Sequence, residues 1–213
     1  MKKYPVVTLC GSTRFKNEFE EAQKKLTLDG NIVISVGLFG HSGDDEVWEN
    51  MPEDTRTETK HMLDDMHKRK IDMADSIYVV NPEEYIGKST WSEICYARMI
   101  GKRIQSLEYI SEMEIESRVG HRIDAADEFA KRSIDVLFHQ GMYADMSKHP
   151  FFKYKGTKIY DPWISPESHA GAFPWIDHED PEKRVDPFET YGKKNAAWII
   201  EELLYQYGKN DFY

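Results

Sequence analysis

Short β-branched runs alternate with segments of helical periodicity through residues 1–107, and this alternation limits the possible fold more than any other feature of the chain. Such runs predict strands, and apolar side chains spaced three or four residues apart predict helices. The strands are expected at Pro5 to Cys10, Asn31 to Val36, Ser76 to Asn81 and Arg103 to Leu107. Strands that alternate with helices form a parallel sheet with helices on both faces. We therefore predict an α/β domain over residues 1–110.

Three helices are expected in this domain. The first has an apolar face of Phe15, Phe19, Ala22 and Leu26, and the others run from about Lys60 to Ala74 and from about Thr90 to Ile100. Small-molecule ligands bind outside the carboxyl ends of parallel strands. The candidate site therefore lies in the loops at those ends, which are residues 11–14, 37–59 and 81–89.

Residues 111–213 form a second part of different character. An amphipathic helix is expected from Ser111 to Gln140, followed by a proline- and aromatic-rich segment over residues 143–191 and a closing helix with Ala196, Ile200, Leu203 and Tyr207 on one face. The apolar stripe of the long helix exceeds what the sheet domain needs, so we expect a homodimer or larger assembly. The alternative is that residues 143–191 cover the stripe within one chain. Trp163 and Trp175 either pack on the long helix or cover a neighbouring subunit's site.

The charge balance excludes two classes of partner. With 28 basic and 38 acidic side chains the formal charge is −10, which argues against binding to nucleic acid or to an anionic membrane. Apolar runs are far shorter than a membrane span, and the N-terminus lacks a signal-peptide core, so a cytosolic protein is expected. Cys10 and Cys95 are too few for a disulfide framework or a cysteine-rich zinc site, and are expected to be buried thiols.

The first strand ends in a turn that has two interpretations. Gly11, Ser12 and Arg14 stand between a strand and a helix, where free backbone N–H groups and the helix dipole attract anions. Arg14 adds a guanidinium fork suited to a phosphate or carboxylate. Alternatively, Gly11 only makes the turn and Ser12 only caps the helix.

The third strand is followed by a similar loop, which contains Gly87 and Ser89 and leads to Glu93 in the first turn of a helix. Glu93 then lies near the ligand end of the sheet and is a candidate catalytic carboxylate. The alternative is a capping box, Thr90-x-x-Glu93, in which the carboxylate returns to the backbone of Thr90.

Taken together, these motifs resemble the nucleoside 2-deoxyribosyltransferase superfamily. The resemblance rests on Cys10–Arg14 (CGSTR), Ala74–Val80 (ADSIYVV), Ser92–Ala97 (SEICYA) and the closing Gly101-Lys102, and it covers about the first half of the chain. The branch it resembles most comprises the deoxynucleoside 5′-monophosphate N-glycosidases, which have a similar Cys-Gly-Ser-x-Arg turn.

This resemblance implies a flavodoxin-like sheet, a homo-oligomer, and cleavage or transfer at the N-glycosidic bond of a (deoxy)nucleoside or nucleoside 5′-monophosphate. Glu93 would be the nucleophile at the anomeric carbon. Gly11, Ser12, Arg14 and Ser89 would lie around the 5′ end of the sugar, and no metal or other cofactor would be needed.

Two positions depart from the family pattern. Thr8 stands where the family usually has a tyrosine, and His67 stands where it has an aspartate. His67 either bonds to a sugar hydroxyl or to Glu93, or is an ordinary histidine on the helix surface. One alternative to a glycosidase is therefore a catalytically silent nucleotide-binding or regulatory module. Another is a glycohydrolase acting on a dinucleotide such as NAD, a larger ligand that the acidic segment and the aromatic tail would enclose.

Two further features bear on function. His61, Asp64, Asp65 and His67 share a helix but offer no recognisable third and fourth ligand, so ion pairs from Asp64 and Asp65 to Lys68 and Arg69 are expected instead of a metal. The long acidic segment 37–59 is either a lid, with Trp48 stacking on a base, or an exposed connector anchored by that tryptophan.

Overall fold

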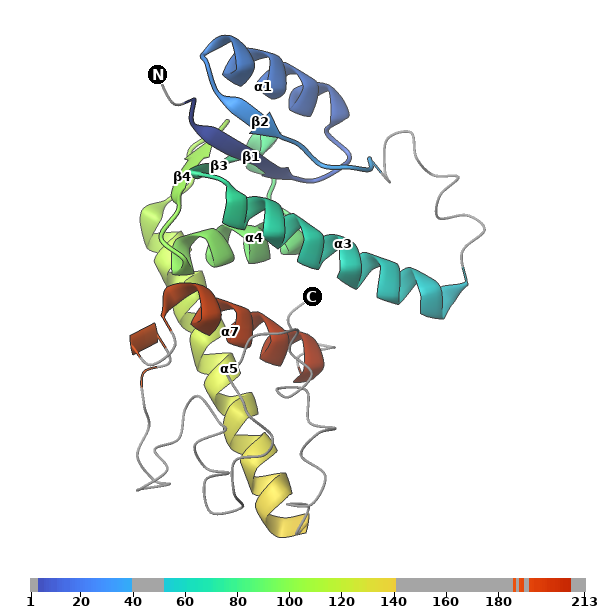
Figure 1. Ribbon diagram of the computed structural model, residues 1–213, viewed down its shortest axis with the longest axis vertical. Coiled ribbons are helices and arrows are strands. Elements are labelled where there is room, and N and C mark those ends of the chain that lie inside the picture. The colour runs from blue at the N-terminus through green and yellow to red at the C-terminus, as the bar shows by residue number, and fades with distance from the viewer. Residues whose placement is uncertain (1–3, 40–51, 141–185, 187, 190–191, 208–213) are drawn as a thin grey trace. The chain divides into compact units, whose positions relative to one another are not determined.

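The computed structural model describes residues 4–39, 52–140, 186, 188–189 and 192–207 (Figure 1). The chain forms two compact units, residues 1–116 and 117–213. Trp48, Trp163 and Trp175, and with them the roles expected for residues 40–51 and 143–185, lie outside the described residues.

The first unit is a four-stranded parallel sheet with helices on both faces, so the prediction of a flavodoxin- or Rossmann-like α/β fold is confirmed. The strand order is β2-β1-β3-β4. The elements are β1 (Val6–Gly11), α1 (Lys16–Leu28), β2 (Ile32–Ile34), α3 (Glu53–Met73), β3 (Ser76–Val80), the 3-10 turn η1 (Pro82–Glu84), α4 (Lys88–Met99), β4 (Arg103–Ser106) and the start of α5 (Glu112–Gln140).

Strand β1 lies inside the sheet, between β2 and β3, and its alternate residues face two different layers. Val7 and Leu9 belong to the apolar cluster that α1 covers, where Phe19 is also buried. Thr8 and Cys10 point to the opposite face, where they meet residues of α3. One face of β1 is therefore apolar, and the other carries polar side chains although it is equally buried.

Helix α3 begins at Glu53, so the prediction that residues 53–59 belong to a loop was wrong. Pro52 precedes the helix with a φ of −56°, which is pre-set for a helix start. Glu53, Arg56, Glu58 and Lys60 favour helix but leave no apolar stripe, and the stripe was the signal used to place the helix.

The C-terminal end of α3 is fixed to α4 through Asp72. The Tyr96 hydroxyl donates to one carboxylate oxygen of Asp72 at 2.7 Å, and Arg69 pairs with the other at 2.9 Å. Lys102 donates to the backbone carbonyls of Asp72 and Ala74 at 3.1 and 2.5 Å. These bonds set the spacing of the two helices that cover the polar face of β1.

The second unit contains the rest of α5 and the helix α7 (Lys193–Tyr207). Arg122 of α5 and Glu201 of α7 form a bidentate ion pair, with three N···O distances of 2.8 to 3.0 Å. Both side chains are largely buried, together with Val119 and Ala126 of α5 and Ala196, Ala197, Trp198, Ile199, Ile200, Leu203 and Leu204 of α7. The described helices are too short or too polar to cross a membrane.

Candidate functional site

Three side chains from three elements meet on the polar face of β1. The Sγ atom of Cys10 in β1 lies 3.6 Å from Nε2 of His67 in α3, and the same nitrogen lies 3.8 Å from Oε2 of Glu93 in α4. The three donor atoms are all within 4.8 Å of one another. We call Cys10, His67 and Glu93 the buried trio.

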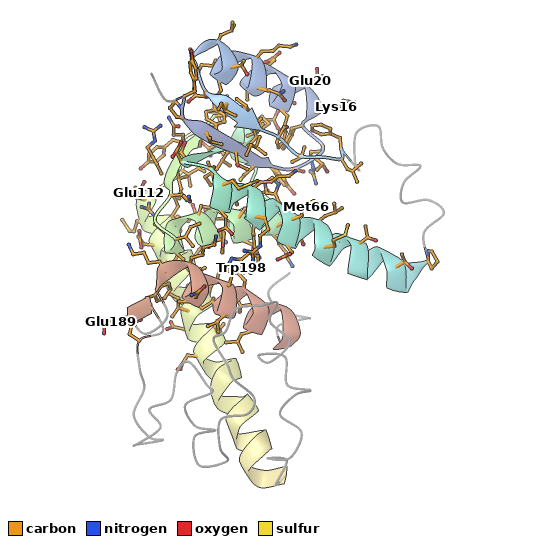
Figure 2. All side chains as sticks on the ribbon, viewed as in Figure 1. Lys16, Glu20, Met66, Glu112, Glu189 and Trp198 are labelled. Carbon is orange, nitrogen blue, oxygen red and sulfur yellow. The ribbon has the colours of Figure 1, made fainter. Side chains whose placement is uncertain are left out.

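Local sequence explains how each member reaches the cluster. Cys10 faces away from α1 because strand residues alternate, and its neighbour Leu9 fills the α1 side. On α3, Met66 is 43% exposed (Figure 2) whereas the next residue, His67, is 7% exposed, since successive helical residues point about 100° apart. The interpretation of His67 as a surface histidine was therefore wrong.

Glu93 is not a helix cap. Helix α4 begins at Lys88 with Gly87 as its N-cap, so Thr90 is already inside the helix and Glu93 lies in the second turn. The capping-box alternative was therefore wrong, and so was the placement of Glu93 in the first turn. The side chain is 13% exposed and turns toward Cys10 and His67 instead of the backbone of Thr90.

Burial dominates the electrostatics of Glu93. It raises the pKa of the carboxyl from 4.5 to about 8, and the charge of Asp64 adds to the rise. A hydrogen bond from Cys10 and the charges of Lys68 and Lys70 act in the opposite direction. Oε2 of Glu93 is buried and has no hydrogen-bond partner among the described residues.

The other two members are also held neutral. Burial lowers the pKa of His67 from 6.5 to about 4, helped by the charge of Lys70 and opposed by a hydrogen bond to the backbone of Leu9. Burial raises the pKa of the Cys10 thiol well above its ordinary value, and Glu93 raises it further. The thiol is therefore not activated as a nucleophile, and the carboxyl is the member of the trio best suited to attack carbon.

Thr8 is next to the buried trio in sequence but is engaged elsewhere. It is fully buried, and its hydroxyl donates to the carbonyl of Lys70 at 3.0 Å. The Lys70 ammonium in turn donates to the carbonyl of Ser35 at 2.9 Å. These two bonds tie α3 to β1 and to the segment after β2, so Thr8 helps to position the helix that carries His67.

The loop after β1 has the expected strand–turn–helix form, but Ser12 does not cap α1. The helix begins at Lys16 with Phe15 as its N-cap and has no side-chain cap, so that alternative was wrong. The Ser12 carbonyl accepts from the backbone N–H of Phe15 at 3.1 Å, which closes the turn. Gly11 is required there, since a Cβ atom would lie 2.6 Å from the carbonyl oxygen of Val80.

Arg14 is exposed, and its guanidinium lies over the ring of Tyr85, 4.4 Å from the ring centroid. This contact links the loop after β1 with the loop after β3. Gly87 and Ser89 of that second loop are partly exposed at the start of α4. The candidate phosphate-binding residues therefore occur on two neighbouring strand-end loops, as expected for parallel strands that lie side by side.

Among the described side chains, the possible metal donors named along α3 do not cluster with one another as a set, and the group of donors in the structure is the buried trio. Asp65 pairs with Arg69 at 3.8 Å, as predicted. His67 instead joins Cys10, which sequence reasoning assigned to an apolar setting, and Glu93. The sequence did contain a signal for this clustering of Cys10. Residues of β1 alternate between two faces, and the polar Thr8 on the same face as Cys10 indicates that this face meets polar partners.

Comparison with protein-family models found no match for the chain, and searches of curated proteins and of solved structures also found none.

Proposed function

We propose that the protein cleaves or transfers the N-glycosidic bond of a (deoxy)nucleoside or a nucleoside 5′-monophosphate, with Glu93 as the nucleophile. The observation that carries this proposal is the buried Glu93 carboxyl, of which Oε2 has no hydrogen-bond partner among the described residues. An oxygen that makes no hydrogen bond is available to attack an electrophilic carbon. Its distance of 3.8 Å from His67 puts a second polar group beside the reacting oxygen.

The reaction would proceed in two steps. The ionised fraction of Glu93, which has already lost its proton to solvent, attacks the anomeric carbon through an oxocarbenium-like transition state. The base leaves, and a glycosyl ester forms on the carboxylate. Water or a second base then attacks the same carbon, and the carboxylate leaves. His67 is the proposed group that orients the incoming nucleophile, because its Nε2 lies 3.8 Å from Oε2 of Glu93.

The strand-end loops are the proposed site for the rest of the substrate. Gly11 ends β1, Ser12 and Arg14 follow it, Gly87 precedes α4, and Ser89 lies in its first turn. Backbone N–H groups at a helix start and a guanidinium are suited to a 5′-phosphate. The contact between Arg14 and Tyr85 supports this proposal, since it holds the guanidinium at the junction of both loops.

A second candidate is a nucleotide-binding module without catalytic activity. It is favoured by Thr8, whose hydroxyl is already bonded to Lys70 and so is not available to assist Glu93. Such a module would bind nucleotides through the same loops and release no base.

The first experiment is a panel of nucleosides, nucleoside 5′-monophosphates and NAD incubated with the full chain in the presence of a metal chelator. Chromatography measures free base, and calorimetry measures binding. We expect base release from at least one nucleoside or monophosphate, loss of that activity in Glu93→Gln, and retention in Glu20→Gln, which removes an exposed carboxylate from α1. Binding without base release would support the silent module, and release from NAD alone would support the dinucleotide alternative.

The oligomeric state is also proposed. Light scattering of the full chain is expected to give at least twice the 24.9 kDa of one chain. A mass of one chain at micromolar concentration would contradict the homodimer.

A further inference from the structure

We propose that the buried trio is a zinc site, in which Cys10, His67 and Glu93 supply three ligands to one Zn²⁺ ion. The three side chains come from β1, α3 and α4, and each offers a donor that zinc accepts: a thiolate sulfur, an imidazole nitrogen and a carboxylate oxygen. This inference goes beyond the proposed glycosidic chemistry, and metal binding itself does not depend on it.

Two of the three donor separations are close to those of a tetrahedral ion, and the third, from Cys10 to Glu93, is at most 4.8 Å. Zinc bonds are about 2.3 Å to sulfur and about 2.0–2.2 Å to nitrogen and oxygen, so two ligand atoms of a tetrahedral ion lie about 3.3–3.6 Å apart. The observed separations are 3.6 Å from Cys10 to His67 and 3.8 Å from His67 to Glu93. The ligand atoms need to move by only a few tenths of an ångström along these two edges.

A bound ion would also satisfy the polar atom that the protein leaves without a partner. Oε2 of Glu93 is buried with no hydrogen bond from the described residues. The negative charges of one thiolate and one carboxylate balance the two positive charges of zinc, so the bound site has no net charge. Asp64 lies close enough to act on Glu93 and favours a cation, whereas Lys68 and Lys70 oppose it.

His67 has the outer contact that orients a metal-bound imidazole. Its Nε2 faces both Cys10 and Glu93, and the side chain is also hydrogen-bonded to the backbone of Leu9. A histidine ligand typically donates its second ring N–H to a backbone carbonyl or a carboxylate, which fixes the ring. His67 thus turns Nε2 toward the other two donors, and the backbone of Leu9 is close enough to help hold the ring in this orientation.

The donor chemistry selects zinc over magnesium or calcium. A thiolate is a soft ligand, whereas magnesium and calcium prefer sets made of oxygen alone. Three protein ligands leave a fourth position for water or another small ligand. While zinc is bound, the Glu93 oxygen bonds to the metal and cannot attack carbon, so zinc would inhibit the proposed glycosidase. This last consequence rests on the proposed function.

The test uses the two cysteines of the chain. In the full-length Cys95→Ser variant Cys10 is the one remaining thiol, so a thiolate-to-cobalt charge-transfer band on adding Co²⁺ must arise from Cys10. We expect this band in wild type and in Cys95→Ser. We also expect Zn²⁺ to displace Co²⁺ and abolish the band.

Zinc affinity is then measured by competition with a chromophoric chelator. His67→Asn and Glu93→Gln should each weaken zinc binding at least 10-fold, since changes outside the ligand shell alone cost roughly that much. The matched controls, Cys95→Ser and His121→Asn, should bind as wild type, and circular dichroism verifies that each variant is folded. Absence of the cobalt band in folded Cys95→Ser, or unchanged zinc affinity in both ligand variants, would overturn the proposal.

The two proposals can fail separately. Zinc binding without base release from chelator-treated protein would remove the glycosidase and keep the metal site. Conversely, the protein could release base, show no cobalt band and be unaffected by zinc. That result would remove the metal site and keep the glycosidase.

Discussion

Nε2 of His67 lies 3.8 Å from Oε2 of Glu93, and burial shifts the pKa of each side chain in the direction that favours its uncharged form. Burial lowers the pKa of His67 to about 4 and raises the pKa of Glu93 to about 8. Near neutral pH the pair is therefore an uncharged imidazole beside a largely protonated carboxyl. Two groups that would form an ion pair at the surface remain neutral here, because burial disfavours both charges.

These opposite shifts predict how stability depends on pH. The native state holds the Glu93 proton up to about pH 8, whereas the unfolded chain loses it near 4.5, so stability falls as pH rises between these values. His67 titrates near 6.5 when unfolded and about 4 when folded, so its contribution rises with pH in that window. The two effects oppose each other up to pH 6.5, and from there to about pH 8 the Glu93 effect lowers stability without this opposition from His67.

Urea unfolding of chelator-treated protein between pH 6.5 and 8 measures this directly. Wild type should lose stability across the window, whereas Glu93→Gln should be nearly flat there and more stable than wild type at pH 8. Glu20→Gln, which changes an exposed carboxylate, should follow wild type. If the free energy of unfolding changed equally with pH in wild type and in Glu93→Gln, the raised pKa of Glu93 would be contradicted.

Arg14→Ala is expected to lower kcat/KM for a 5′-phosphorylated substrate more than kcat/KM for the matching nucleoside. A hydrogen bond to a charged group contributes about 1.5–3 kcal/mol, so kcat/KM for the monophosphate should fall about 10- to 100-fold. Steady-state kinetics with both substrates checks this, and Lys24→Ala on α1 is the charge-matched control. Equal losses with both substrates would show that Arg14 does not contact the phosphate.

Gly11→Ala should destabilise the sheet domain. The new methyl group would lie 2.6 Å from the Val80 carbonyl oxygen and 3.1 Å from the ring of Phe19, so a strand or the ring must move. Overpacking of this kind costs about 1–3 kcal/mol, measured as a lower free energy of unfolding. Gly37→Ala, where the described residues beyond its two chain neighbours place no atom within 4 Å of the new Cβ, should change stability little. A stable Gly11→Ala would mean that β1 and β3 are less closely packed there.

The Arg122–Glu201 pair predicts a strong effect in the second unit. The side chains are 12% and 2% exposed, so Arg122→Met removes the guanidinium that forms a bidentate ion pair with a buried carboxylate and should cost about 3–5 kcal/mol. Replacing both residues, as Arg122→Met with Glu201→Leu, should recover most of this loss. Thermal unfolding of the three variants provides the comparison. If the double variant were no more stable than Arg122→Met, the loss of stability would not be due to the broken ion pair.

The parallel sheet could be predicted because its signal is local. Each strand is a β-branched run, and α1 repeats Phe19, Ala22 and Leu26 on one face. The start of α3 could not be predicted in this way, since residues 53–60 favour helix without an apolar stripe.

The buried trio shows how much of the candidate site could not be predicted from the sequence. Glu93 and His67 were candidates from the family resemblance, but their approach to Cys10 joins residues 83 and 57 positions apart along the chain. That approach depends on how α3 and α4 pack, and therefore on long-range bonds such as Tyr96 to Asp72 and Thr8 to Lys70. Spacing along one helix contains no information about such bonds.

The central claim is that Glu93 forms a covalent bond to the sugar, and trapping that bond tests it most directly. The full chain, freed of metal by a chelator, is incubated at about pH 8, where a substantial fraction of Glu93 is ionised, with a 2′-fluorinated analogue of the nucleoside that the panel identifies. Fluorine beside the anomeric carbon slows both steps, and a good leaving base lets the ester accumulate. Mass spectrometry of the digested protein should show one added glycosyl group on the peptide that contains Glu93, and none in Glu93→Gln. Turnover of the unmodified nucleoside with no adduct from the analogue, or an adduct on another residue, would contradict the account.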